Sequence, residues 1–181
     1  MTNRGTQSRR QKFAQALFNS VITYVPSHGI RQNFLRLFGA EIGRETSINR
    51  GSTVYGIERL VIGDNCSIGF DVMLDARGGL VIDDAAVIAS DSHLITGRQV
   101  VDGDDFEIEF GPIHLEHHTW VTSRVTVLPN VTIAAGAVVG ACSLVTEDVP
   151  AMATAAGVPA KIRGTRESTL DYQPFFRPLL Y

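Results

Sequence analysis

Histidine is the side chain best suited to exchange protons near neutral pH, because its unperturbed pKa is about 6.5. The 181-residue chain has five histidines, and four of them lie between residues 93 and 118. His93 stands alone, His114 follows an acidic stretch, and His117 and His118 are adjacent. Such residues could act as a general base or bind a metal, so the elements that would position them matter first.

Composition places the chain among compact soluble domains. It has 44% hydrophobic and 19% charged residues and a formal net charge of −3, which excludes disordered and collagen-like proteins and gives no reason to expect nucleic-acid binding. No apolar run approaches the roughly 20 residues of a membrane-spanning helix. Basic residues precede an apolar stretch at 13–25, but polar residues interrupt it, so we expect mature, cytoplasmic sequence with at most peripheral membrane contact.

The two cysteines, Cys66 and Cys142, are too few for a disulfide framework and lack the paired spacing of zinc sites. Both fall at small-residue positions of an internal repeat. We therefore expect them to be core thiols rather than reactive ones.

An aliphatic residue recurs at every sixth position, with the phase restarting after each insertion. The fifteen register positions are Ile42, Ile48, Val54, Ile62, Ile68, Leu74, Ile82, Ile88, Leu94, Leu115, Val121, Val127, Ile133, Val139 and Val145. The fourth residue after each is small or β-branched in thirteen cases. A period of six fits neither a helix nor a simple strand, but it is typical of a β-solenoid.

Three hexads make one coil, so the repeat predicts about five coils. The insertions, the pairs at 60–61 and 80–81 and the segment 100–114, all fall after the third hexad of a coil, which places them at one corner. Residues 1–41 predict short amphipathic helices, broken at Pro26, that cap the first coil. Residues 42–150 form the repeat with the protruding loop 100–114, and residues 151–181, rich in proline, predict an irregular tail.

Several phrases together with this repeat resemble the hexapeptide-repeat acyltransferases. They are Leu74-Asp75-Ala76-Arg77-Gly78-Gly79, the stretch from Trp120 to Pro129, Val145-Thr146-Glu147-Asp148-Val149-Pro150 and Gly157-Val158-Pro159-Ala160-Lys161. The chain is most similar to the galactoside, maltose and surface-polysaccharide O-acetyltransferases. The resemblance implies a left-handed parallel β-helix, a homotrimer, and acetyl-coenzyme A held in a groove between neighbouring subunits.

In this family a histidine before the protruding loop is the general base: it deprotonates an acceptor hydroxyl, which attacks the thioester. Counting along the repeat from Ile82, or back from Phe106, places that histidine at Gln99. An amide does not take up a proton at neutral pH, so the motif supports the fold but not unaltered chemistry.

Two histidines are candidates to replace it. His93 lies one hexad earlier at a different corner, where a surface histidine at a turn is the simpler interpretation. His114 closes the insertion and returns to the corner that Gln99 leaves, so we expect His114 to be the base, with Gln99 orienting the acceptor or the imidazole. An exposed loop-end histidine without a role is the alternative for His114.

Zinc is a further alternative, because some left-handed β-helices are zinc-dependent carbonic anhydrases. His117 and His118 are expected at mid-face, and His114 and His118, four apart in a strand, point along different faces rather than towards one metal. We therefore expect no metal.

The resemblance also implies residues for the acyl donor. Ser123 matches the position whose backbone N–H faces the thioester carbonyl, and Ala141 and Thr146 match positions that line the pantetheine. Lys161 matches a basic residue near the phosphates, and Arg163 is a second candidate in a slightly different register. Trp120 is expected either to form the floor of the acyl site or to pack at the trimer contact; small residues that only fit tight turns are the alternative for Ser123, Ala141 and Thr146.

The insertion is expected to build the acceptor pocket. Its acidic residues, Asp102, Asp104, Asp105, Glu107 and Glu109, favour a neutral sugar or a cationic acceptor, unless they only solvate the loop. The sequence therefore predicts a coenzyme A-dependent O-acetyltransferase acting on a sugar hydroxyl. A catalytically inactive trimeric homologue and a zinc-dependent hydratase are the alternatives.

Overall fold

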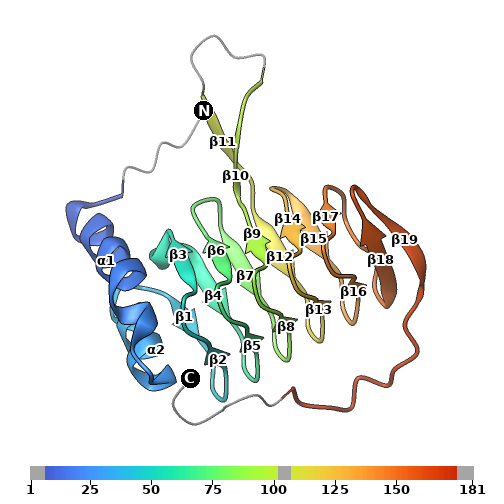
Figure 1. Cartoon of the computed structure of the whole chain (residues 1–181), viewed down its shortest axis with the longest axis horizontal. Coiled ribbons are helices and arrows are strands. Elements are labelled where there is room, and N and C mark those ends of the chain that lie inside the picture. Colours follow the sequence, from blue (N-terminus) through green and yellow to red (C-terminus); the bar gives the residue numbers. More distant parts are fainter. Residues whose placement is uncertain (1–6, 102–106, 175–181) are drawn as a thin grey trace.

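The polypeptide winds into a parallel β-solenoid whose coils stack along one axis, with two helices at one end (Figure 1). The structure, a computed structural model, describes residues 7–101 and 107–174. Each coil contributes one short strand to each of three sheets, here called sheets A, B and C.

Sheet A contains β1 (Glu41–Ile42), β4 (Leu60–Ile62), β7 (Leu80–Ile82), β12 (Ile113–Leu115) and β15 (Val131–Ile133). Sheet B contains β2 (Ser47–Ile48), β5 (Ser67–Ile68), β8 (Val87–Ile88), β13 (Trp120–Val121), β16 (Val138–Val139), β18 (Ala153–Gly157) and β19 (Ala160–Thr165). Sheet C contains β3 (Thr53–Tyr55), β6 (Met73–Asp75), β9 (His93–Leu94), β14 (Thr126–Val127) and β17 (Leu144–Val145).

Burial of every sixth residue holds the coils in register. In sheet A, for example, Ile62 pairs with Ile82, Ile82 with Leu115, and Leu115 with Ile133. Fourteen of the fifteen register residues are at most 2% exposed, while Ile42 on the first coil is half-buried. The predicted β-solenoid register is therefore confirmed.

The turn between hexads explains the rest of the repeat. The third residue after a register residue adopts a left-handed backbone, with φ of 58° at Asn65, 61° at Asp91 and 59° at Arg124. This bend returns the fourth residue to the interior, where Thr46, Ser92 and Ala137 are all fully buried. Small residues suit these positions because they lie at the corners of a narrow core.

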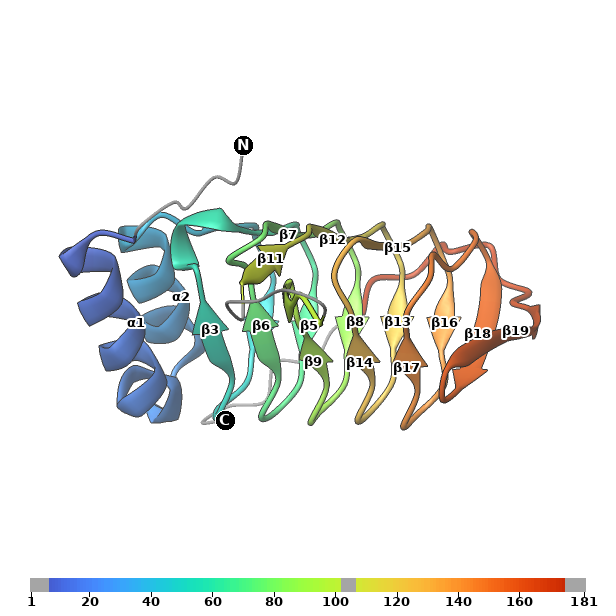
Figure 2. The ribbon, with the colours of Figure 1, turned by 90° about the horizontal axis from the view of Figure 1, so that it is seen from above.

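Five complete coils and part of a sixth are present. The sixth is marked by a bridge between Ile133 and Val149 and by β18, which extends sheet B beside β16. Between sheets C and A the chain makes its largest excursions, the 3-10 turn at Ile57–Arg59 and a hairpin of β10 (Gly97–Gln99) and β11 (Ile108–Phe110). The predicted shared corner is thus where the hairpin leaves the solenoid (Figure 2).

The predicted helical cap is present as α1 (Arg9–Ser20) and α2 (His28–Leu37), with a 3-10 turn at Ile22–Tyr24 between them. Phe18 and Leu35 are fully buried, which joins the cap to the core of the first coil. The Asn19 side-chain amide accepts a hydrogen bond from Val54 N and donates one to Val54 O. The cap therefore satisfies backbone groups that the sheet edge would otherwise leave open.

Residues 151–174 are more regular than the expected irregular tail. Strand β19 folds back on β18 as an antiparallel hairpin that closes the far edge of sheet B. The physical reason is the same as for the cap, because an exposed sheet edge needs hydrogen-bond partners. The chain then runs back along the corner between sheets A and B (Figures 1 and 2).

Candidate active site

On the solenoid surface, the imidazole of His114 forms a hydrogen bond with the carboxylate of Asp83. His114 is the central residue of β12, between Val81 and Thr132 of the neighbouring strands. Its Nε2 lies 2.9 Å from Oδ2 of Asp83, and both side chains are about 40% exposed. Because a carboxylate only accepts hydrogen bonds, Nε2 carries the proton in this pair and Nδ1 is left as the basic nitrogen.

A pocket lies next to this pair on the outer surface of the early coils. Its volume is about 280 Å³, and its lining includes Val61, Ile82, Asp83, Asp84 and His117. This volume is slightly below the usual range for ligand pockets, so the pocket suits only a small molecule.

Gln99 is separated from His114 by the hairpin. It pairs with Ile108 on the part of the hairpin that projects from the corner, and its side chain is exposed. The residue that bonds the imidazole of His114 is Asp83 instead of Gln99. Asp102, Asp104 and Asp105, expected in the acceptor pocket, lie outside the described residues.

Glu109, one of the acidic residues of the insertion, is paired with a basic residue just outside it. Its Oε2 lies 3.1 Å from Nη2 of Arg98, directly across the hairpin. Glu107 lies one residue before β11.

His93 occupies a strand instead of the expected turn. It lies on β9 of sheet C, between Met73 and Thr126, and is half-buried. Its position is on a different sheet from His114.

His117 and His118 lie at the corner between sheets A and B, not at mid-face as expected. His118 has the left-handed backbone of the turn, with φ of 56°, because it is the third residue after Leu115. Its Nε2 lies 3.1 Å from the carbonyl oxygen of Tyr172 in the returning C-terminal segment. Within residues 7–101 and 107–174, no three His, Cys, Asp or Glu side chains are grouped as a metal site.

The residues implied for the acyl donor fall at two places. Ser123 and Ala141 occupy equivalent turn positions at the corner between sheets B and C, and they are exposed on successive coils. The coils are joined there by the hydrogen bond from Cys142 N to Ser123 O, 3.0 Å long. Trp120 lies on sheet B and is 45% exposed.

Thr146 follows β17 and is exposed near the last coil. Lys161 lies on β19, with Nζ 3.6 Å from Oε2 of Glu147, the neighbour of Thr146. Arg163 is also on β19, where its Nε donates to Ala156 O at 3.3 Å. The structure therefore brings Thr146 and Lys161 close together and leaves Arg163 further along the same strand.

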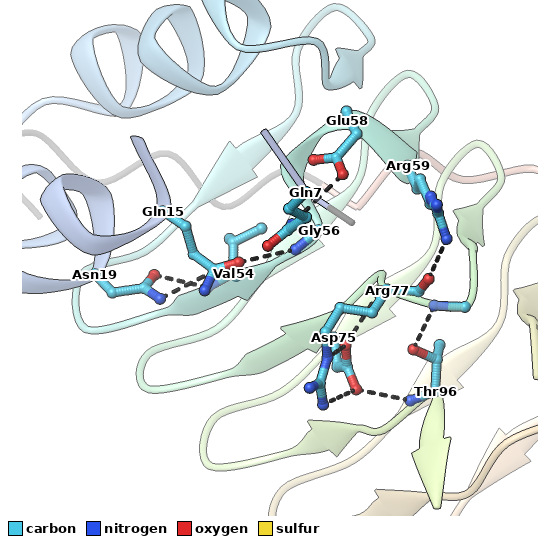
Figure 3. A network of polar contacts seen from close by, with 11 residues as sticks. Gln7, Gln15, Asn19, Val54, Gly56, Glu58, Arg59, Asp75, Arg77 and Thr96 are labelled. Atoms are coloured by element: carbon cyan, nitrogen blue, oxygen red, sulfur yellow. Dashed lines mark hydrogen bonds and ion pairs between the residues drawn. The ribbon is translucent and has the colours of Figure 1, made fainter. Parts of the chain in front are cut away.

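A second polar cluster, at the base of the hairpin, was not anticipated from the sequence. The Arg77 guanidinium donates to both carboxylate oxygens of buried Asp75, at 2.8 and 3.0 Å (Figure 3). Thr96 N donates to the same carboxylate. The hydrogen bond to Asp75 raises the pKa of Arg77 above its ordinary value.

Asp83 was also missed, although the repeat holds a signal for it. Gly43 and Gly63 directly follow their register residues, and Asp83 takes the equivalent position on the next coil. The column continues with Glu116 and Ala134, so the change from glycine to carboxylate at Asp83 is only a weak signal.

The chain matches no protein-family model, but it is similar to known acetyltransferases. It is similar to the hexapeptide-repeat acetyltransferase VCA0836 from Vibrio cholerae, solved with acetyl-coenzyme A. That structure is 26% identical and has a TM-score of 0.74, and the match covers 87% of this chain and 86% of that one. A protein of Escherichia coli (strain K12) named as a colanic acid biosynthesis acetyltransferase, WcaF, is 36% identical over 139 residues, which are 77% of this chain and 76% of that protein. The chain belongs to the hexapeptide-repeat acetyltransferases.

Family membership confirms the predicted resemblance and makes the protein an enzyme of the acetyltransferase class. A maltose O-acetyltransferase from Clostridium difficile 630 has the same fold, with a TM-score of 0.75 and 20% identity over 88% of this chain and 86% of that one. The predicted left-handed parallel β-helix is the fold of this family.

Proposed function

We propose that the protein is a coenzyme A-dependent O-acyltransferase acting on a sugar hydroxyl, with His114 as its general base. The observation that carries the proposal is the Asp83–His114 hydrogen bond beside a pocket on an acetyltransferase scaffold. The relatives support the substrate class. The E. coli relative is named for colanic acid biosynthesis, VCA0836 was solved with acetyl-coenzyme A, and a polysialic-acid-specific acetyltransferase, NeuO, is 28% identical with a TM-score of 0.57.

Asp83 gives His114 the properties that a base requires. The carboxylate holds the proton on Nε2, so Nδ1 is free to take the proton of an acceptor hydroxyl. It also stabilises the imidazolium that forms, as the carboxylate does in hydrolase triads. Asp83 is thus a positioning residue, and His114 is the residue that contacts the acceptor.

The reaction balances through this one base. The acceptor hydroxyl gives its proton to His114 as its oxygen attacks the thioester carbonyl, a C–O bond forms, and the C–S bond breaks. His114 then returns the proton to the departing thiolate. The developing oxyanion needs an N–H donor, and we assign this to the backbone of Ser123.

The surface at the corner between sheets B and C fits an extended thioester donor. Ser123 and Ala141 are small and exposed on successive coils, which leaves a path for a narrow chain along the corner. Beyond the last coil, on β19, Lys161 and Arg163 are exposed and positively charged. Such side chains suit the phosphate groups of the donor. When bound, the donor supplies the activated acyl group.

The two halves of this site lie on different sides of one subunit. His114 lies on sheet A, while Ser123 and Ala141 lie at the opposite corner, between sheets B and C. One chain therefore does not close the site, whereas a ring of identical subunits does so at each boundary. The proposal accordingly includes a homotrimer.

The test is an assay of acyl transfer from acetyl-coenzyme A to a panel of neutral mono- and disaccharides. The rate is measured from the release of free coenzyme A thiol. We expect His114→Ala to lower kcat/KM by about 10²- to 10⁴-fold, the usual contribution of a general base. Asp83→Asn should lower it by about 10- to 100-fold, since Asp83 is partly exposed and acts only through His114. His93→Ala, a half-buried histidine on another sheet, is the matched control and should retain activity.

Calorimetric titration with acetyl-coenzyme A separates chemistry from donor binding. Binding should be equal in the natural protein and in His114→Ala. Full transfer by His114→Ala, or activity that appears only after Gln99→His, would show that His114 is not the base. If acetyl-coenzyme A did not bind at millimolar concentration, the protein would share the fold of the family but not its acyl donor, and the proposed function would be wrong.

A further inference from the structure

The charge of the chain is divided unevenly along its length. Residues 1–40 contain six Arg and Lys and no Asp or Glu, so this segment carries +6. Because the whole chain carries −3, the remaining residues carry −9. An asymmetry of this kind points to a polyanionic surface as a partner.

The helical cap presents part of this charge together with apolar side chains, while Arg31 is fully buried. Phe13 of α1 is 66% exposed, and Ile30 and Leu37 of α2 are 51% and 68% exposed. Arg9 and Lys12 are exposed on α1. These five residues are here called the cap face.

Capping the solenoid does not explain the cap face. That task is done by Ala14, Phe18 and Leu35, which are fully buried. Helical spacing turns Ile30 and Leu37 to the side of α2 opposite Leu35, and Arg9 and Lys12 to the side of α1 opposite Ala14 and Phe18. Both views place these helices at the end of the solenoid away from β18 and β19 (Figures 1 and 2).

The charges of the cap face are not neutralised within the protein. In the part of the chain that the structure describes, Arg9 and Lys12 form no ion pair. Two cap faces would repel each other, which disfavours a second copy as the partner. Exposed Phe, Ile and Leu have no use on a nucleic-acid backbone, but they insert readily between lipid headgroups.

We propose that the cap face docks on an anionic lipid bilayer and holds the solenoid at a membrane surface. Neither helix in the described segments is long and apolar enough to cross a membrane. The binding is therefore interfacial: basic side chains contact lipid headgroups and Phe13, Ile30 and Leu37 enter the boundary with the acyl chains. It is independent of the acyl-transfer chemistry and is measured without it.

The test is co-sedimentation of the full chain with phosphatidylcholine vesicles and with mixed phosphatidylcholine–phosphatidylglycerol vesicles. We expect binding only to the mixed vesicles, and we expect it to weaken as salt is added, because screening shortens the range of the attraction. Arg9→Gln with Lys12→Gln should weaken partitioning by about 10- to 30-fold. Phe13→Ser with Leu37→Ser should weaken it by at least about tenfold.

Val158→Ser is the matched control. Val158 is 71% exposed, like Leu37, but lies in the turn between β18 and β19 at the other end of the molecule. It should bind mixed vesicles as the natural protein does, and circular dichroism should show unchanged helix content in all variants. Equal binding by the cap variants, no binding at low salt, or a change of oligomeric state in Phe13→Ser with Leu37→Ser would overturn the proposal.

Discussion

Cys66 and Cys142 differ by one position in the repeat, and this difference decides their reactivity. Cys66 is the fourth residue after Ile62 and points into the core, where it is 1% exposed. Cys142 is the third residue after Val139, the left-handed turn position, and it is exposed. The expectation of two core thiols is therefore wrong for Cys142.

Alkylation should distinguish the two thiols. Burial raises the pKa of Cys66 to about 11, so its thiolate is scarce at mildly alkaline pH, whereas Cys142 is exposed and accessible to the reagent. We expect iodoacetamide to modify Cys142 alone in the folded protein and both cysteines after denaturation. Peptide mass spectrometry would locate the label, and rapid labelling of Cys66 in the folded state would contradict this assignment.

At the scale of elements, the hairpin β10–β11 depends on Arg77. Its guanidinium lies 5.2 Å from the ring centre of Phe110 and 5.5 Å from that of Tyr55, while it bonds buried Asp75. Arg77 thus links Asp75, at the end of β6, to Phe110 of the returning strand β11. The hairpin is fixed at its base even though it projects from the solenoid.

Removing Arg77 should leave the Asp75 carboxylate buried without its cationic partner. We expect Arg77→Ala to lower the free energy of unfolding by about 2–3 kcal/mol, measured by urea denaturation. Arg98→Ala is the matched control on the same hairpin, because it breaks an exposed pair with Glu109 and should cost less than about 1 kcal/mol. If both variants lowered the free energy of unfolding equally, the Asp75–Arg77 pair would stabilise the protein no more than the exposed Arg98–Glu109 pair does.

At the scale of the whole molecule, the separation of the proposed half-sites leads to a complementation test. The His114→Ala variant and the Ala141→Trp variant should each be inactive when expressed alone. The test is to express the two together. In randomly mixed trimers, about a quarter of the sites would combine an intact His114 with an intact Ala141 from the neighbour. We therefore expect partial activity to return in purified mixed trimers.

Two results would count against a shared site. One is the absence of recovered activity in trimers that mass spectrometry shows to be mixed. The other is a monomer by light scattering with full acyl-transfer activity.

Several features could be predicted from residues near one another in the sequence. The register from Ile42 to Val145, the corner of the insertions and the helices around Pro26 all depend on local patterns. Others could not: the left-handed turns place His117, His118 and Cys142 at corners, and a shift of one residue in counting moves a side chain from the core to the surface. The strands β18 and β19 were missed because prolines and small residues suggested an irregular segment.

The sequence by itself determined the β-solenoid, because burying one aliphatic residue in every six leaves the chain no other regular arrangement. It also determined the family, through phrases such as those around Trp120 and Lys161. The tertiary structure decided the chemistry of the surface: Asp83 and His114 are 31 residues apart, and they meet only because β7 and β12 pair across the insertion. Such contacts depend on how strands stack, and the spacing of residues within one strand does not contain that information.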